Sequence, residues 1–438
     1  MSVLAEILLS EGFSVSGSDM HSTALTRLLE EKGARIFYGQ RKENITPDID
    51  LVVYTAAIHP DNPEYVAMTQ LGIPSLTRAQ LLGQMMHNYK TPIAVSGTHG
   101  KTTTTSMITQ ILLEADADPT ISVGGILKSI GGNIRVGKSE LFVTEACEYT
   151  NSFLSFFPRI GIILNIEEDH LDFFRDLADI RSSFHRFARL LPTNGLLILN
   201  GAIDDPGQIT EGLACPFVTF GHDPGCDYYD TDITYDELGH VSFILHTRDG
   251  RSQPVRLSVP GEHNVLNALA ALALADALRL DLRAAADALT GFTGTDRRFE
   301  YKGSLSGVTI IDDYAHHPTE ITATLRAAAN YPHRKLWCVF QPHTYTRTKS
   351  FMDDFAAALS LADRVILADI YAARETDTLG VSSRDLQQKI RDLGTECDYF
   401  PTFEAIENFI LENCIPGDLL ITMGAGDVVN IGESLLGQ

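Results

Sequence analysis

Short β-rich apolar runs alternate with segments of helical periodicity along almost the whole chain. This alternation is typical of α/β units built on mainly parallel sheets. Near the start, the runs Phe13–Gly17, Arg35–Tyr38 and Leu51–Thr55 are predicted strands separated by helical stretches. We find no internal repeat and no low-complexity tract, so the joints between units must be short. The pattern predicts an α/β fold in several closely joined domains.

Two joints divide the pattern into three predicted domains, residues 1–90, 91–294 and 295–438. Within the middle domain, Pro216–Val259 is richer in turns and in alternating polarity, which predicts an antiparallel insertion. The last domain is predicted to be a smaller doubly wound sheet. Its predicted strands are Val308–Asp312, Leu336–Phe340, Val365–Asp369 and Leu419–Met423.

The start of the chain departs from this pattern. Leu4, Ile7 and Leu8 form one face of a predicted helix, whereas a dinucleotide-type domain opens with a strand and a glycine-rich turn. We therefore interpret the first domain as truncated before that strand and glycine-rich loop. The alternative is a fold that simply begins with a helix. Ser18 and Asp19 follow the first predicted strand, where a nucleotide ribose is often held.

Composition narrows the function classes. The chain of 438 residues carries 34 basic and 57 acidic residues, a formal net charge of −23. This balance argues against binding to duplex nucleic acid and against docking on an anionic membrane, because both require a basic surface. The longest apolar stretch, Val265–Leu280, is interrupted by polar residues and is shorter than the roughly 18 residues of a spanning helix. The six cysteines show no C-x-x-C spacing, which predicts reduced thiols in a cytoplasmic protein.

The segment Pro92–Thr102 combines a strand, a glycine turn and the start of a helix. Backbone N–H groups of such a turn, aided by the helix N-terminus, cradle phosphate oxygens. The general pattern G-x-x-x-x-G-K-[ST] fails because Val95 occupies its first glycine, and the shorter G-T-H-G-K-T stands instead. Lys101 would reach the β and γ phosphates of a nucleotide, and the Thr102 hydroxyl would bind Mg²⁺. The predicted nucleotide-binding residues are Gly97, Thr98, His99, Gly100, Lys101, Thr102 and Thr103.

The stretch G-T-H-G-K-T-T-T at 97–104 resembles the ATP loop of the Mur ligases, the ATP-dependent amide-bond formers of peptidoglycan synthesis. Four further motifs extend the resemblance: N-I-E-E-D-H-L-D at 165–172, P-G-E-H-N-V-L-N at 260–267, D-D-Y-A-H-H-P at 312–318 and Q-P-H-T-Y-T-R at 341–347. The resemblance implies a three-domain Mur ligase architecture. A truncated Rossmann-like N-terminal domain would precede a P-loop ATPase-like central domain and a Rossmann-like C-terminal domain.

The last two motifs are most similar to the family member that adds the first amino acid. The resemblance thus implies a ligase that uses ATP to join L-alanine to the muramyl carboxylate of UDP-N-acetylmuramate through an acyl phosphate, in peptidoglycan precursor biosynthesis. Two alternatives stay open: a ligase that recycles murein tripeptide, which has a similar D-x-A-H-H-P motif, and a non-catalytic nucleotide-binding homologue. We expect a monomer or a weak homodimer.

The resemblance also implies a magnesium site. Cys147 stands where the family often has an aspartate, so we expect Glu148 to take over part of the role of that aspartate. Several relatives use a carbamylated lysine near the metal, but no lysine lies between Lys138 and Lys302, which excludes that device here. Phe184 lies near the corresponding position, as in the alanine-adding member. The implied metal ligands are Thr102, Glu145 and His170.

Further nucleotide contacts are implied near the second joint. Asn264 is placed by the resemblance at the adenine. Arg297 and Arg298 would bring a guanidinium to the γ-phosphate as the domains close, and which of the two does so stays open. Asp313, or its neighbour Asp312, ends a predicted strand where nucleotide contacts are expected.

The substrate-binding residues are implied at both ends of the molecule. An arginine fork suits a carboxylate, and the polar cluster that resembles the alanine end of the family is Tyr314, His316, His343 and Arg347. The UDP part would contact Ser18, Asp19, Ala57 and Ile58. The implied catalytic set is Lys101, His170, Arg298, His316, His343 and Arg347.

Overall fold

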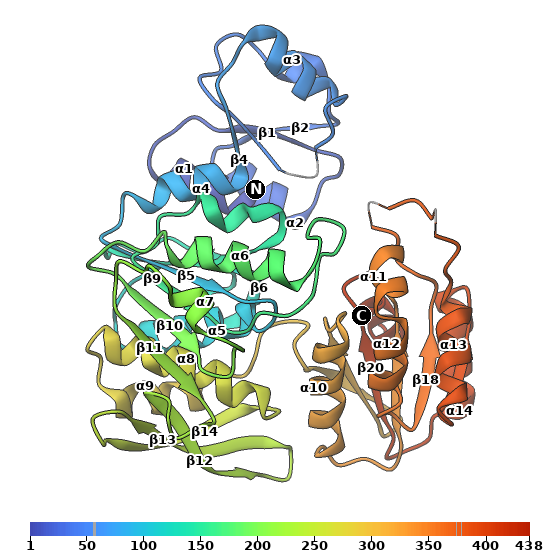
Figure 1. The fold of residues 1–438 in the computed structure, drawn as a ribbon. Helices are drawn as coiled ribbons and strands as arrows, with labels where there is room; N and C mark the ends of the chain where they lie inside the picture. The colour runs from blue at the N-terminus through green and yellow to red at the C-terminus, as the bar shows by residue number, and fades with distance from the viewer. Residues whose placement is uncertain (56–57, 374, 378) are drawn as a thin grey trace.

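The structure, a computed structural model, describes residues 1–55, 58–373, 375–377 and 379–438. It has an N-terminal lobe, a central lobe built on the largest sheet, and a C-terminal lobe beside the central one (Figure 1). The six cysteines are all free. In the described part of the chain, no helix combines the length and the apolar character needed to cross a bilayer.

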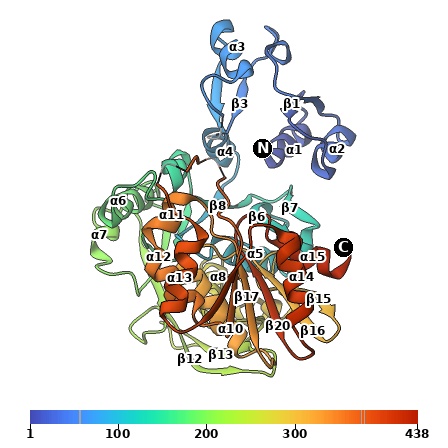
Figure 2. The ribbon, with the colours of Figure 1, turned by 90° about the vertical axis from the view of Figure 1, so that its right-hand side faces the viewer.

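The N-terminal lobe holds two separate parallel strand pairs, which Figure 2 shows on different sides of the lobe. They are β1 (Ser16–Asp19) with β2 (Arg35–Tyr38), and β3 (Val52–Tyr54) with β4 (Ser75–Thr77). The helices are α1 (Ser2–Ser10), α2 (Ala24–Glu31), the 3-10 turn η1 (Lys42–Asn44), α3 (Pro63–Leu71) and α4 (Arg78–Met86).

The predicted helix at the start is confirmed by α1, which buries Leu4 and Ile7. The second and third predicted strands are confirmed by β2 and β3. The first predicted strand overlaps β1 but was placed three residues too early at its start and two at its end, because Phe13 still belongs to the turn that closes α1. Its N–H donates to the Leu8 carbonyl at 3.0 Å, so β1 begins only at Ser16.

The central lobe is a sheet of ten strands, counted over the described residues, in the order β14-β13-β12-β11-β10-β9-β5-β8-β6-β7. The strands are β5 (Thr91–Ser96), β6 (Thr120–Leu127), β7 (Gly132–Arg135), β8 (Leu141–Ala146), β9 (Ile160–Ile163), β10 (Leu196–Asn200), β11 (Phe217–Gly221), β12 (Tyr228–Tyr235), β13 (His240–Thr247) and β14 (Ser252–Pro260). The helical segments are α5 (Lys101–Glu114), η2 (Lys128–Ile130), η3 (Tyr149–Ser155), α6 (Leu177–Ala188), α7 (Gly207–Thr210), α8 (His263–Ala277) and α9 (Leu282–Thr290). The pairs β12–β13 and β13–β14 are antiparallel, which confirms the predicted insertion.

The C-terminal lobe is a mainly parallel sheet in the order β15-β16-β20-β17-β18-β19. The strands are β15 (Glu300–Leu305), β16 (Val308–Asp313), β17 (Leu336–Phe340), β18 (Arg364–Leu367), β19 (Glu396–Tyr399) and β20 (Leu419–Met423). The helices are α10 (Pro318–Ala329), α11 (Tyr345–Ser350), α12 (Met352–Leu359), α13 (Ser383–Asp392), α14 (Phe403–Asn413) and α15 (Val429–Leu436). The four predicted strands are confirmed, and the edge strands β15 and β19 were not predicted.

Helices α1 and α4 of the N-terminal lobe share a buried apolar cluster with the central sheet. Leu4 and Met86 belong to the same cluster as Phe153, Phe184 and Phe187 from the central lobe. The rings of Phe153 and Phe187 stack with centroids 4.8 Å apart. Because this burial is apolar and continuous, the N-terminal lobe is fixed to the central lobe by two helices rather than by strand pairing.

The approach of α4 to the central lobe requires a glycine. A β-carbon added at Gly83 would lie 1.9 Å from the Ser155 carbonyl oxygen at the end of η3. Gly83→Ala should therefore push α4 off the central lobe and cost about 1–3 kcal/mol of stability, measured as a lower Tm in a thermal melt.

Gly132→Ala is the matched control, because no atom lies within 4 Å of the added carbon and Gly132 lies in a strand. Its Tm should stay at the wild-type value. An unchanged Tm for Gly83→Ala would show that α4 does not make this close contact.

Candidate active site

The loop between β5 and α5 has the geometry predicted for a phosphate-binding turn. Gly97 and Gly100 have φ values of 143° and 81°, which favour glycine. A β-carbon at Gly100 would also lie 2.6 Å from the Asn267 side-chain oxygen. Asn165 holds the loop from the other side: its side-chain oxygen accepts from the His99 N–H at 2.8 Å and its amide donates to the His99 carbonyl at 3.2 Å.

Lys101 folds back over this loop. Its ammonium donates to the Thr98 carbonyl at 3.0 Å and pairs with the Glu148 carboxylate at 3.0 Å. Burial alone would lower the pKa of Lys101, but the neighbouring Glu148 carboxylate outweighs burial and raises it well above its ordinary value. A charged lysine thus lies at the position predicted to meet the β and γ phosphates.

The three predicted metal ligands make two sets of contacts. The Thr102 hydroxyl donates to Glu145 Oε2 at 3.1 Å. His170 Nε2 lies 3.8 Å from Glu148 Oε1 and 3.7 Å from Asp169 Oδ2. Burial lowers the pKa of His170, which favours the neutral imidazole that a metal requires. Hydroxyl, carboxylate and imidazole are donor types that a divalent cation accepts.

A second group of potential ligands lies at the lobe interface. His99, Glu167 and His317 each have a ligand atom within 4.8 Å of the others. Both nitrogens of His317 are already engaged, however. Nε2 contacts the Glu168 carbonyl oxygen at 3.0 Å and Nδ1 accepts from the Thr319 N–H at 3.3 Å. We therefore interpret this group as part of the interface between lobes.

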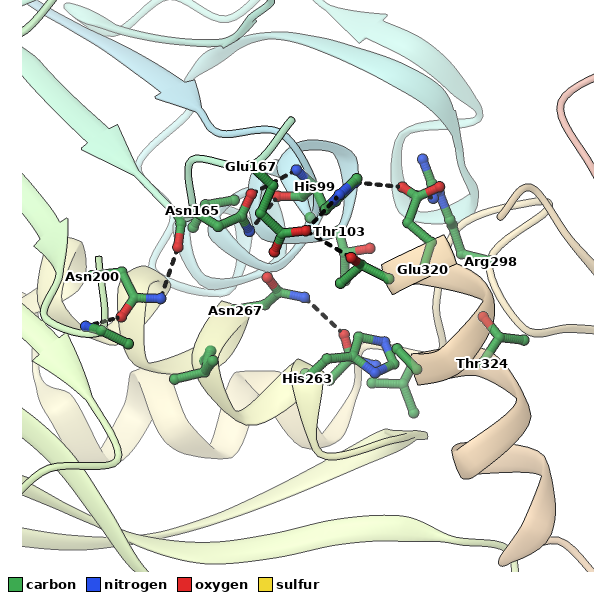
Figure 3. Close-up of a pocket in the computed structure, with 18 of the residues that line it drawn as sticks. His99, Thr103, Asn165, Glu167, Asn200, His263, Asn267, Arg298, Glu320 and Thr324 are labelled. Atoms are coloured by element: carbon green, nitrogen blue, oxygen red, sulfur yellow. Dashed lines mark hydrogen bonds and ion pairs between the residues drawn. The ribbon is translucent and has the colours of Figure 1, made fainter. Parts of the chain in front are cut away.

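A pocket of about 490 Å³ extends from the phosphate loop between the central and C-terminal lobes. Figure 3 shows His99 of the loop and Thr103 of α5 facing it, with α8 below and α10 at one side. His99 and Gly100 of the loop and Thr103 of α5 line it, together with Asn264, Arg298 and Asp313 of the predicted set. The structure thus brings the loop, the start of α8 and the second joint to one cavity.

Asn264 lies in the first turn of α8 and belongs to a buried chain of side-chain hydrogen bonds. Its amide donates to the Pro260 carbonyl at 2.8 Å, and its oxygen accepts from Asn267 at 3.0 Å. The Asn267 oxygen accepts in turn from Thr104 of α5 at 3.1 Å. The pocket wall near α8 is therefore fastened to the helix that follows the phosphate loop.

The two arginines of the joint have different environments. Arg298 lines the pocket, and its Nη1 lies 3.7 Å from Glu320 Oε1. Arg297 donates to Asp312 at 3.0 Å and to the carbonyls of Gly424 and Gly426 at 2.7 and 3.1 Å. Arg297 thus ties a turn of the C-terminal lobe to the joint and does not line the pocket.

Asp313 and His263 line the same pocket, and burial favours the neutral form of both side chains. It raises the pKa of Asp313 to about 6 and lowers the pKa of His263 to about 4. Asp313 accepts the N–H groups of Ala315 and Phe299 at 2.8 and 2.7 Å. His263 was missed in the sequence, although it lies in the motif that contains Asn264.

The residues predicted for the amino-acid end lie together. The rings of His316 and His343 have centroids 5.8 Å apart, and Tyr314 lies 5.4 Å from His316. Arg347 Nη1 lies 3.3 Å from His343 Nδ1. Burial lowers the pKa of His316 to about 3, so this imidazole is neutral.

Arg347 also reaches across to the central lobe. Its Nε and Nη2 donate to Asp169 Oδ1 at 3.1 and 2.8 Å. Burial would raise the pKa of Asp169, but the Arg347 guanidinium holds it well below its usual range. Asp169 was missed in the sequence because its partner lies 178 positions away, although it stands in a motif that was noted for its histidine.

The predicted contacts for the UDP part lie elsewhere. In the N-terminal lobe, the Ser18 hydroxyl donates to Glu64 at 2.7 Å, and Asp19 accepts from the His21 N–H at 3.2 Å. Ser18, Asp19 and Ile58 do not line the pocket described above. Ala57 lies outside the described residues.

A phosphate loop opening onto a cleft between α/β lobes defines a nucleotide-dependent enzyme. The models of three family domains match the chain: the Mur ligase family catalytic domain at residues 1–90, the Mur ligase middle domain at 95–275 and the Mur ligase glutamate ligase domain at 297–426. The chain belongs to the Mur ligase family.

Curated relatives carry a more particular name. The chain is 59% identical over 437 residues to the UDP-N-acetylmuramate–L-alanine ligase of Lachnospira eligens, covering 100% of this chain and 95% of the relative. It is 55% identical over 446 residues to the same-named protein of Lachnoclostridium phytofermentans, with the same coverage. The expected loss of an N-terminal strand and glycine-rich loop is not confirmed, since the first family domain matches residues 1–90.

Two solved structures are similar over the whole chain. The UDP-N-acetylmuramate-alanine ligase MurC of Thermotoga maritima has a TM-score of 0.84 at 30% identity, covering 100% of this chain and 96% of that one. A murein peptide ligase of Psychrobacter arcticus has a TM-score of 0.73 at 27% identity with the same coverage. The three-lobed α/β architecture predicted from the sequence is therefore confirmed.

The environment of His99 predicts a pH-dependent stability. Its Nδ1 lies 3.3 Å from Glu320 and its Nε2 lies 3.4 Å from Glu167. Burial opposes the charged imidazole, but the two carboxylates outweigh burial and raise the pKa of His99 to about 9. The folded-state pKa is above the ordinary value of 6.5, so this stabilisation is complete below pH 6.5 and is lost as the pH rises through 9.

The Tm of the wild type should therefore fall more between pH 6.5 and 9.5 than the Tm of His99→Asn, which carries no titrating group there. Glu167→Gln, which removes one of the two carboxylates, should shift the wild-type decline to lower pH. Parallel Tm curves for wild type and His99→Asn would contradict a charged His99.

Proposed function

We propose that this chain joins L-alanine to the carboxylate of UDP-N-acetylmuramate with ATP as energy source, in peptidoglycan precursor biosynthesis. The observation that carries the proposal is that contacts at one lobe interface join the phosphate loop to the cluster of His316, His343 and Arg347. Glu320 contacts both His99 and His316, and Asp169 of the central lobe binds Arg347. The names of the full-length relatives support the same pair of substrates.

The chemistry accounts for this arrangement. A carboxylate resists attack by an amine, so one of its oxygens first accepts the γ-phosphoryl group, which leaves ADP and an acyl phosphate. The amine of L-alanine then attacks the acyl carbon through a tetrahedral intermediate, phosphate leaves, and the amine loses a proton. The protein needs no covalent nucleophile for these steps. It must position the three reactants and neutralise their negative charge.

Lys101 would neutralise charge on the β and γ phosphates after exchanging its Glu148 partner for phosphate oxygens. Arg298 would face the γ-phosphate from the joint, whereas Arg297 keeps its structural contacts. Asn264 would lie at the adenine, and Asp313 lines the same pocket. Thr102, Glu145 and His170 would hold Mg²⁺, which when bound screens phosphate charge and polarises the transferred phosphoryl group.

Arg347 would bind the carboxylate of L-alanine. Asp169 accepts from Nε and Nη2, and Nη1 contacts His343, so the substrate carboxylate would share or displace one of these partners. The neutral His316 beside it adds no charge that would repel the amine. Asp169 is therefore proposed as the residue that orients Arg347 from the central lobe.

The remaining assignments stay proposals. Ser18, Asp19 and Ile58 would meet the UDP part in the N-terminal lobe. The domain boundaries at 90/91 and 294/295 also stay proposals; the matched family segments cover residues 1–90, 95–275 and 297–426. A cytoplasmic location and a monomer or weak homodimer complete the proposal.

A second candidate is a ligase for murein peptide, which the similarity to the Psychrobacter arcticus structure favours. The same active-site chemistry would then act on a larger amine donor. A non-catalytic nucleotide-binding homologue is opposed by the presence of Lys101, Thr102, Glu145, His170 and Arg347 in one connected site.

Phosphate release from ATP and Mg²⁺ tests the proposal directly. Release should require both UDP-N-acetylmuramate and L-alanine, and the product should gain the mass of one alanyl residue. Release with L-alanyl-γ-D-glutamyl-diaminopimelate in place of L-alanine would favour the second candidate. Arg347→Ala should raise the KM for L-alanine about tenfold or more, since it removes a charge-assisted hydrogen bond.

Replacing each of the two arginines at the joint should have a different effect, one on kinetics and the other on stability. Arg298→Gln should raise the KM for ATP about tenfold with little change in Tm, because its guanidinium faces the pocket. Arg297→Gln should instead lower the Tm by several degrees, because it frees the carbonyls of Gly424 and Gly426 and the buried Asp312. The opposite pattern would assign the phosphate contact to Arg297.

A further inference from the structure

One carboxylate in the first turn of α10 touches both halves of the site. Glu320 Oε1 lies 3.3 Å from His99 Nδ1 of the phosphate loop and 3.7 Å from Arg298 Nη1 of the joint. Glu320 Oε2 lies 3.3 Å from His316 Nδ1 and accepts the His316 N–H at 3.1 Å. Figure 3 shows the Glu320 side chain leaving α10 between His99 and Arg298.

We propose that Glu320 is a positioning residue that couples occupancy of the phosphate loop to the arrangement of the amino-acid end. This inference rests on the function proposed above for His316 and Arg298. The carboxylate uses one oxygen toward the nucleotide side and the other toward the amino-acid side. A movement of His99 or Arg298 on nucleotide binding therefore changes the partner of the same group that holds His316.

Because the Glu320 carboxylate is mostly buried, it depends on its protein partners. The Glu320 side chain is only 12% exposed, and the His99 side chain is 11% exposed. A partly buried charge requires partners, so its oxygens cannot simply turn to water when a neighbour moves. The lobes meet at this point, because His99 comes from the central lobe while Glu320 and His316 come from the C-terminal lobe.

A purely local role is the competing explanation. A carboxylate in the first turn of a helix interacts favourably with the helix dipole and with the exposed N–H groups there. Glu320 accepts the His316 N–H in this way. Such a role would stabilise the start of α10 and would leave the phosphate loop unaffected.

Glu320→Gln separates the two explanations because it keeps the size of the side chain. Glutamine has one acceptor oxygen and one donor amide, so it can satisfy either the nucleotide side or His316, but not both. Arg326→Ala, at an exposed position in the last turn of the same helix, is the matched control for α10.

The first measurement is amide hydrogen exchange on the full, nucleotide-free chain. If Glu320 couples the two regions, Glu320→Gln should speed exchange in residues 97–101 as well as in residues 314–321. Faster exchange confined to 314–321 would overturn the proposal in favour of the local role. Arg326→Ala should change neither segment.

The second measurement is calorimetric binding of L-alanine, with UDP-N-acetylmuramate present, with and without a non-hydrolysable ATP analogue. Glu320→Gln should reduce the factor by which the analogue tightens L-alanine from about tenfold toward one. An unchanged factor would overturn the proposal. If the wild type binds no L-alanine under either condition, the proposed function fails, and the exchange experiment alone then decides whether Glu320 links the two segments.

Discussion

The site depends on a short acidic segment, residues 167–169, that follows the central strand β9 and touches both sides of the cleft. Glu167 accepts the Thr319 hydroxyl at 2.7 Å, the Glu168 carbonyl contacts His317, and Asp169 holds Arg347. Just before it, Asn165 fixes the phosphate loop through the backbone of His99. One segment of the chain thus contacts both the phosphate loop and the C-terminal lobe. A shift of this segment would displace both halves of the site together.

The cations of the site are all paired with carboxylates of the protein. Lys101 pairs with Glu148, Arg298 with Glu320, and Arg347 with Asp169. In a chain of net charge −23, this arrangement keeps positive charge localised where anionic reactants must bind. A phosphate or a substrate carboxylate must share or displace an existing partner, and only a ligand with comparable charge and geometry can do so. Pairing of the cations therefore favours anionic groups that match the charge and geometry of a carboxylate over anions that do not.

Local patterns were sufficient to predict the loop, the core strands and the antiparallel insertion, because these depend on neighbouring residues. The edge strands β15 and β19 were missed because sequences such as Glu396-Cys-Asp-Tyr399 are short and contain acidic residues, which are depleted in strands. Glu320 and Asp169 could not be assigned from the sequence, since their partners come from distant parts of the chain. Arg297 and Arg298 are adjacent, and only the positive φ of 61° at Arg297 and the contacts around it distinguish their roles.

The two interfaces of the central lobe differ in chemistry, and this difference bears on how substrates enter. The N-terminal lobe is joined through apolar side chains of α1 and α4 that belong to a core shared with the central sheet. Among the residues that the structure describes, each buried apolar cluster stays on one side of the interface with the C-terminal lobe. That interface includes the hydrogen bonds and ion pairs made by His99, Asp169, His317 and Glu320. Water can replace polar contacts far more cheaply than it can hydrate an apolar core. Separating the C-terminal lobe from the central lobe would therefore expose less apolar core to water than separating the N-terminal lobe would.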